Sequence, residues 1–232
     1  MFFEPDATRY DLKFSLFGIP IRVHPMFWAL GIFFGSARGL DYALVWVSIL
    51  FVSILVHELG HSLVMRVYGI QSHIVLYTMG GLAIPLHGKN TTPYKNIAIS
   101  LAGPFAGFFL AAVAILVGVE MGGELSLQWF AFIPFPHLQF SSYWHYTVFS
   151  SILWVNICWG IINLLPVFPL DGGQVFRELF LLFLPNNGLR YSLWLSVITG
   201  GALAIWGIIS LKSIFMLLLF GSLAYSSYQS LK

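Results

Sequence analysis

Long apolar runs follow one another along the sequence, and short segments between them carry the charged residues. The run at 42–65 alone is as long as a bilayer-spanning helix, which needs about 20 apolar residues. Only 9% of the residues are charged and 58% are hydrophobic. Soluble domains carry about 25% charged residues. The chain is therefore expected to be an integral membrane protein.

The apolar runs predict an all-α polytopic membrane protein with about six transmembrane helices. We find no internal repeat and no linker of low complexity, so residues 1–232 are expected to form a single membrane domain. No PDZ insertion and no CBS domain is apparent in this sequence. The helical spans are expected at 25–37, 42–65, 97–119, 146–165, 191–211 and 213–229.

Three apolar segments lack the pattern of a spanning helix. Residues 14–23 combine Gly, Pro and β-branched residues, which predicts extended structure. In residues 70–87, two glycines and a proline interrupt the run, which favours a small membrane-associated β-hairpin or re-entrant segment. Residues 124–140 are rich in Phe and contain Trp and Pro, so they are expected to form an interfacial loop.

The basic residues of the short loops predict the orientation, because Lys and Arg favour the cytoplasmic side. The loop after the second span carries three basic residues and no acid, and the loop after the third carries two acids and no base. Both termini are therefore expected in the cytoplasm, with Lys212 as the one exception to the charge bias. The chain is expected to be a multi-pass protein of the plasma membrane.

The run at 42–65 contains His57, Glu58 and His61 in the sequence HELGH. A charged side chain at bilayer depth costs roughly 2.5–3.5 kcal/mol on the more lenient scale, so the cluster requires an explanation. On a helix, His57 and His61 share one face and can present their nitrogens to a single ion. Glu58 lies about 100° round the helix, where it can reach a water without being a ligand. This is the geometry of the H-E-x-x-H zinc signature; the alternative is a polar cluster that ties helices together.

A catalytic zinc ion generally takes three protein ligands and one water. The predicted topology places Asp41, Glu120 and Glu124 on the opposite side of the membrane from the histidines. Asp171 follows the fourth span, in the segment NLLPVFPLDGG at 163–173, where prolines break the helix and glycines let the backbone fold back. One carboxylate, two neutral imidazoles and a hydroxide would also balance the charge of Zn²⁺. Asp171 is thus the favoured third ligand, and an ordinary turn residue is the alternative.

The two motifs resemble the site-2 proteases, a family of intramembrane zinc metalloproteases. HELGH in the second span and NLLPVFPLDGG at the end of a later span follow the order of that family, and the resemblance covers about residues 14–178. It implies one Zn²⁺ per chain. The charge bias of the loops separately predicts that the zinc site lies toward the cytoplasmic side. The implied roles are zinc ligand for His57, His61 and Asp171, catalytic base for Glu58, and a polar residue lining the site for Asn163.

Asn156 and Asn163 are expected on one face of the fourth span, two helical turns apart. Either residue could bind substrate or the oxyanion, and either could instead tie helices together. Relatives often have Asn where this chain has Gly107 after its LAGP segment, a difference expected to affect packing more than chemistry.

Three functions are compatible with these residues. The leading one is an intramembrane zinc endopeptidase that hydrolyses peptide bonds within or near transmembrane segments of membrane-anchored substrates, with Glu58 as general base. A metal-ion transporter would use the same ligands as a transit site, but it would need further ligands across the bilayer. An inactive scaffold that binds transmembrane helices is the third. The chain contains no run of Lys or Arg, so nucleic acid is not an expected partner.

Overall fold

The computed structural model describes residues 4–78, 80–86, 91–130 and 133–232. The chain forms two compact units. The first, the sheet unit, contains Glu4–Lys89 and Ala102–Ile161. The second, the C-terminal unit, contains Asn90–Leu101 and Ile162–Lys232. The expectation that residues 1–232 form a single membrane domain stays a prediction.

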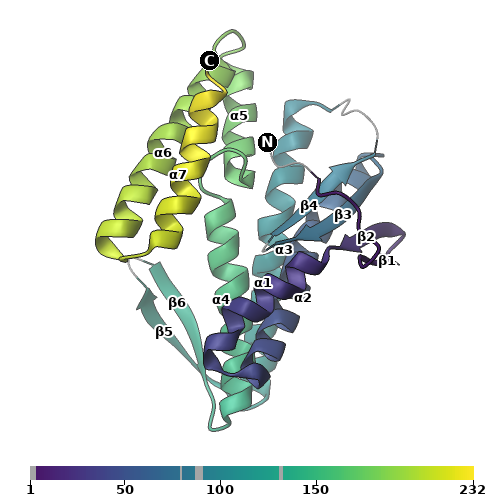
Figure 1. The fold of residues 1–232 in the computed structure, drawn as a ribbon, viewed down its shortest axis with the longest axis vertical. Coiled ribbons are helices and arrows are strands. Elements are labelled where there is room, and N and C mark those ends of the chain that lie inside the picture. Colours follow the sequence, from purple (N-terminus) through teal and green to yellow (C-terminus); the bar gives the residue numbers. More distant parts are fainter. Residues whose placement is uncertain (1–3, 79, 87–90, 131–132) are drawn as a thin grey trace. The chain divides into compact units, whose positions relative to one another are not determined.

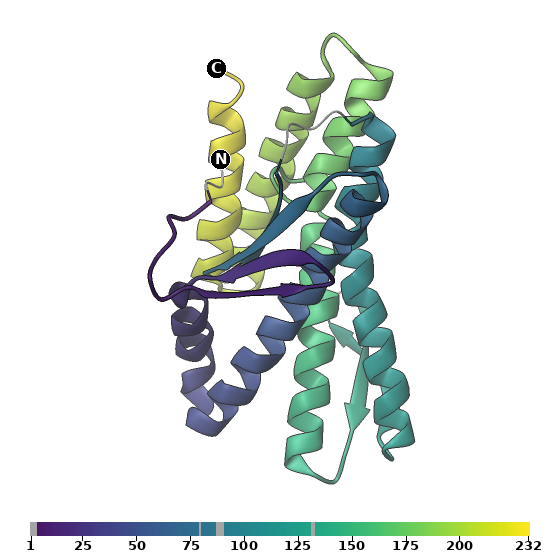
Figure 2. The ribbon, with the colours of Figure 1, turned by 90° about the vertical axis from the view of Figure 1, so that its right-hand side faces the viewer.

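A four-stranded sheet with the order β1-β2-β3-β4 characterises the sheet unit (Figure 2). β1 pairs antiparallel with β2, β2 parallel with β3, and β3 antiparallel with β4. The expectations of extended structure within 14–23 and of a hairpin within 70–87 are confirmed. The strands are β1 Leu12–Leu16, β2 Ile19–Val23, β3 Ser72–Tyr77 and β4 Gly80–Pro85.

The helices of this part of the chain begin and end close to the expected bounds. α1 starts at Pro25, and the side chain of His24 caps it by accepting a hydrogen bond from the backbone N–H of Met26. A short 3-10 turn at Ser36–Arg38 leads into the next helix. The helices are α1 Pro25–Gly35, α2 Leu40–Val67, α3 Pro93–Glu120 and α4 Tyr143–Asn163, the last two having residues in both units.

β2 alternates buried and more exposed residues, as a strand with one covered face does. Its buried side chains are Ile19, Ile21 and Val23, which belong to one apolar cluster with Phe27 of α1 and Ile54 of α2. This cluster fixes the sheet against the helix that carries the HELGH motif.

The prediction that residues 124–140 form a loop is wrong, because β5 (Glu124–Phe130) and β6 (Ile133–Gln139) pair as an antiparallel hairpin; that the segment is interfacial stays a prediction. Polar and apolar residues alternate along the first part of β5, which is the period of a strand, and residues 124–129 are all exposed. The prolines of β6 are tolerated because each strand of a two-stranded sheet has one unpaired edge. The aromatic content suggested an interfacial segment, but the alternation decides its conformation.

The C-terminal unit contains α5 (Asp171–Phe183), α6 (Gly188–Ser210) and α7 (Ile214–Gln229). α6 and α7 lie side by side (Figure 1). Gly200 permits a close approach there, because a Cβ at this position would lie 3.2 Å from the Cβ of Ala224. Asp171 does not lie in an ordinary turn, the alternative to its expected role as a ligand. It lies in the first turn of α5, where an acidic residue is favourable to the helix dipole.

Four helices among the described residues are long and apolar enough to cross a membrane: α2, α3, α4 and α6. α7 is apolar but has 16 residues, and α1 has 11. A helix rises 1.5 Å per residue, so α1 covers about 17 Å of a hydrocarbon core roughly 30 Å thick. The expectation of six spans is therefore confirmed only in part, and the chain is a mostly helical membrane protein with small sheets.

Candidate metal centre

His57 and His61 lie on one face of α2, inside the sheet unit. Both side chains are buried, with 4% and 7% of their surface exposed. Their Nε2 atoms are 3.2 Å apart and their rings are nearly perpendicular, at 79°. Two nitrogens bound to one tetrahedral zinc at about 2.05 Å would lie about 3.3 Å apart. The observed spacing therefore fits two ligands of one ion, and it also allows a hydrogen bond between one protonated and one unprotonated ring nitrogen.

Gly103 of α3 leaves open the space in front of these nitrogens. A Cβ at this position would lie 2.2 Å from Nε2 of His61 and 2.8 Å from Nε2 of His57. A second glycine, Gly60 of α2, faces the backbone of α3, where a Cβ would lie 2.5 Å from the carbonyl oxygen of Ala102. The two helices thus cross closely at the histidine pair, and Gly103 places no side chain against the two nitrogens.

Glu58 follows His57 and is also buried, with 5% of its surface exposed. Strand β4 passes next to its side chain, because a Cβ on Gly81 would lie 2.4 Å from Cγ and 2.7 Å from Oε1 of Glu58. Among the described residues, β4 pairs with β3 alone, so its other edge is free of strand partners. The carboxylate of Glu58 therefore lies beside a strand with one open edge.

Asn156 of α4 is buried and uses its amide group inside the protein. Its Nδ2 donates to Oγ of Ser53 on α2 at 2.8 Å and to the carbonyl oxygen of Ile152 at 2.9 Å. These contacts give Asn156 the helix-tying role that was one of its two expected roles. A role in binding substrate stays a prediction.

Asp171 and Asn163 belong to the C-terminal unit, and both are buried. Asp171 is the first residue of α5. The two glycines after it pack against the preceding loop: a Cβ on Gly172 would lie 2.1 Å from the carbonyl oxygen of Leu164, and one on Gly173 would lie 2.4 Å from the backbone nitrogen of Phe168. The glycines therefore let the first turn of α5 lie directly on the segment that links it to α4.

The loop before Asp171 is held by the helices of its own unit. The backbone N–H of Phe168 donates to Oγ of Ser196 on α6 at 3.0 Å, and Oγ of Ser227 on α7 donates to the carbonyl oxygen of Phe168 at 3.4 Å. The guanidinium of Arg177 on α5 lies over the Phe168 ring. Hydrogen bonds and a cation–π contact thus fix the backbone that presents Asp171.

Gly81 and Gly103 were not expected to shape the site. Their sequence signals, the GG pair at 80–81 and the LAGP segment at 101–104, are weak features of the resembled family. A glycine in a sequence indicates a turn, a flexible point or a close approach equally well. Only the three-dimensional contacts identify these two as close approaches.

Comparison with known proteins decides the family. The model of peptidase family M50 matches residues 45–148 and 133–188, which together make up more than half of the chain and include both motifs. The chain belongs to peptidase family M50. The resemblance to zinc metalloproteases is therefore confirmed at the level of the family.

Two relatives of this M50 member extend the comparison. A zinc metalloprotease of Methanocaldococcus jannaschii is 28% identical over 179 residues, which is 73% of this chain and 45% of that protein. Stage IV sporulation protein FB of Bacillus subtilis is 28% identical over 177 residues, which is 71% of this chain and 48% of that protein. The chain thus spans less than half the length of these relatives.

A solved structure supports the same assignment. The site-2 protease from Methanocaldococcus jannaschii has a TM-score of 0.60 and 25% sequence identity to this M50 member, and the match covers 96% of each chain. The fold is therefore like that of a site-2 protease, and the family resemblance found in the sequence is confirmed.

Proposed function

We propose that the protein is an intramembrane zinc endopeptidase that hydrolyses peptide bonds within or near transmembrane segments of membrane-anchored proteins. The observation that carries the proposal is the pair of buried Nε2 atoms of His57 and His61, 3.2 Å apart, on a helix long and apolar enough to cross a membrane. A buried glutamate follows the first histidine. Membership of peptidase family M50 supports the same chemistry and favours it over metal transport or a scaffold role.

His57, His61 and Asp171 bind one zinc ion per chain. Each offers one ligand atom of a type that zinc accepts, an imidazole nitrogen or a carboxylate oxygen, and all three residues are buried. The glycine at 103 leaves room in front of the two nitrogens. A single carboxylate among the ligands also keeps the net charge of the site low, as a low-dielectric environment requires.

Zinc supplies a Lewis acid and lowers the pKa of a bound water to about 7. Glu58 accepts a proton from the attacking water and then delivers it to the amine that leaves the cleaved peptide bond. Its position beside Gly81 of β4 holds the carboxylate close to the strand without side-chain crowding. Asn163 donates a hydrogen bond to the oxygen that becomes negatively charged, which stabilises the transition state.

A substrate helix must unwind before it is cut, because its own backbone hydrogen bonds occupy the peptide carbonyls. The open edge of β4 offers backbone hydrogen-bond partners to the unwound segment. Substrates are therefore transmembrane segments with Gly, Pro or Asn near the cut. A fully Leu-rich segment resists cleavage because it remains helical.

The zinc site and both termini face the cytoplasm, and the protein resides in the plasma membrane. His61 lies five residues and His57 nine residues before Arg66 on α2. At 1.5 Å per residue, the pair is roughly 7–14 Å inside the cytoplasmic boundary. This shallow depth lets water reach the site from the cytoplasm.

Metal content and cleavage, measured together, test the proposal. Wild type and Glu58→Gln should each contain one zinc by mass spectrometry, and Asp171→Ala should lose it. Cleavage of a Gly- and Pro-containing transmembrane peptide should fall about 10²–10⁴-fold in Glu58→Gln, the usual contribution of a general base.

If Glu58→Gln cleaved the peptide as fast as wild type, Glu58 would not be the general base. If Asp171→Ala still contained one zinc, Asp171 would not be a zinc ligand. If the protein carried zinc into proteoliposomes and cleaved no peptide, a transporter would be the better interpretation. If it bound transmembrane helices and never cut them, it would be a scaffold.

A further inference from the structure

A pocket lined by polar and aromatic side chains lies in the sheet unit, away from the histidine pair. It has a volume of about 390 Å³ and lies among the start of α2, the first turns of α4 and the β5–β6 hairpin. Trp46 on α2 lines it, and eleven residues separate Trp46 from His57. At 1.5 Å per residue this is about 16 Å along the helix axis. The pocket is therefore distinct from the proposed zinc site.

Two hydrogen-bonding groups of this pocket are buried without a partner. Nε1 of Trp46 and Oγ of Ser150 have no hydrogen-bond partner in the described part of the chain, and both residues line the pocket. An indole N–H is a donor only, and a hydroxyl can donate as well. Because buried polar groups are normally hydrogen-bonded, two unpartnered groups from different helices indicate a ligand that carries acceptor oxygens.

The charge of the pocket is positive. Arg38 lines it, with its guanidinium 5.0 Å from the ring centre of Tyr42 and a hydrogen bond of 3.2 Å to the Tyr42 hydroxyl. No carboxylate of the described residues forms an ion pair with Arg38, and none lines this pocket. A guanidinium beside neutral donors, without an acid to neutralise it, is suited to a phosphate group.

The surroundings indicate where such a phosphate comes from. The pocket is formed at the starts of α2 and α4, two of the candidate membrane spans. Trp129 and Trp154 line it and are 76% and 41% exposed. Exposed tryptophans such as Trp129 of the hairpin are typical of the level at which lipid headgroups lie, whereas Trp154 lies eleven residues into α4. The phosphate at this level belongs to a phospholipid.

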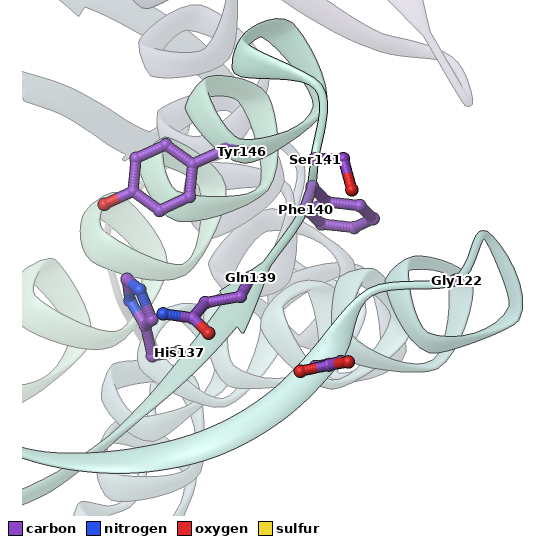
Figure 3. Close-up of a pocket in the computed structure, with 7 residues that line it drawn as sticks. Gly122, His137, Gln139, Phe140, Ser141 and Tyr146 are labelled. Atoms are coloured by element: carbon purple, nitrogen blue, oxygen red, sulfur yellow. The ribbon is translucent and has the colours of Figure 1, made fainter.

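A neighbouring hollow of about 520 Å³ shares His137 and Tyr146 with this pocket (Figure 3). The rings of these two residues are 5.5 Å apart, edge to face. Glu124 and Gln139, which face each other across the hairpin, also line the hollow. The part of a headgroup that extends beyond the phosphate thus meets a carboxylate, which favours an ammonium group.

We propose that the two adjoining pockets bind the headgroup of an aminophospholipid. The phosphate accepts hydrogen bonds from Arg38, Trp46 and Ser150, and the ammonium group lies toward Glu124. The acyl chains then run along the exposed aromatic side chains at the hairpin.

Native mass spectrometry of the detergent-purified protein tests this, with phosphatidylethanolamine and phosphatidylglycerol as probes. Both lipids carry the phosphate, and only the first carries an amine. Wild type should retain phosphatidylethanolamine in preference to phosphatidylglycerol. Arg38→Ala should bind phosphatidylethanolamine about tenfold more weakly, the loss expected for one charge-assisted hydrogen bond.

Three further variants make the test specific. Trp46→Phe removes the N–H donor together with the five-membered ring but keeps an aromatic side chain, so it should bind phosphatidylethanolamine more weakly than wild type while the protein stays folded. Glu124→Gln should abolish the preference between the two lipids and leave phosphate binding intact. Arg190→Ala removes an exposed arginine at the start of α6 and should bind like wild type.

Equal retention of phosphatidylethanolamine by Arg38→Ala, Trp46→Phe and Arg190→Ala would overturn the site. Equal binding of the two lipids by wild type would overturn the role of Glu124. If inorganic phosphate alone displaced the lipid at millimolar concentration, the pocket would be a site for a free anion and the lipid proposal would fail.

Discussion

At the scale of single residues, Gly103 is the position where adding one carbon atom should most directly affect zinc binding. Its Cβ would lie 2.2 Å from Nε2 of His61 and 2.8 Å from Nε2 of His57, so an added methyl group would push against both proposed ligand atoms. We expect Gly103→Ala to lose most of its bound zinc, measured by mass spectrometry on the purified protein.

Gly201 of α6 is the matched control for this substitution. It is also a helical glycine, but a Cβ there would meet no atom within 4 Å. Gly201→Ala should keep one zinc and fold at least as well as wild type, because alanine favours helix. If Gly103→Ala contained as much zinc as wild type, the absence of a side chain at position 103 would not be required for zinc binding.

A cluster of ionised side chains on the N-terminal segment should make stability depend on pH. The Thr8 hydroxyl donates to Asp11, and Arg22 forms an ion pair with Asp11 at 3.0 Å. These contacts lower the pKa of Asp11 from its ordinary 3.8 to about 2, and the Thr8 hydrogen bond is the larger cause.

Because this pKa is lowered by folding, the contact stabilises the protein fully above the ordinary value and is lost as the pH falls through about 2. We expect Asp11→Asn to have a lower Tm than wild type at neutral pH. The difference should shrink below the ordinary pKa and vanish as the wild-type carboxyl becomes protonated. A difference that does not change across this range would show that the charge of Asp11 is not what stabilises the segment.

At the scale of elements, the packing of α6 on α7 depends on which glycine faces the partner helix. A Cβ on Gly200 would lie 3.2 Å from the carbonyl oxygen of Phe220, whereas one on Gly201 would meet no neighbour. We expect Gly200→Leu to lower the Tm, since overpacking costs about 1–3 kcal/mol. Gly201→Leu should leave the Tm close to that of wild type. Equal melting of the two variants would mean that this helix pair does not limit stability.

At the scale of the whole molecule, zinc should contribute to stability through ligands from distant parts of the chain. The proposed ligands lie on α2 of the sheet unit and on α5 of the C-terminal unit. A ligand that binds only the folded state stabilises it by about 4 kcal/mol at a thousandfold excess over its Kd.

A strong chelator should therefore lower the Tm of wild type. The same chelator should leave the Tm of His57→Ala unchanged, because this variant lacks a proposed ligand. If the chelator lowered the Tm of both proteins equally, the stabilising metal would not be bound at the proposed site.

Much of the local structure could be predicted because it follows from periodicity. The spacing of His57 and His61 required a helix for the two nitrogens to meet, and the structure places them 3.2 Å apart. The β-hairpin at β5–β6 and the helix α5 were missed because prolines and glycines have several local meanings. Their conformations depend on which neighbours they contact.

The sequence by itself determined that the chain belongs in a membrane, that its zinc-signature residues share one helical face, and that extended segments flank the first two helices. These properties depend on composition and on the fixed geometry of the helix and the strand. Only the tertiary structure decided that β2 pairs parallel with β3 and that Gly103 and Gly81 place no side chain against the histidines and the glutamate. It also decided that Trp46 and Ser150 line one pocket without hydrogen-bond partners among the described residues. Such contacts join residues far apart in the chain, and they depend on which faces pack together rather than on any local pattern.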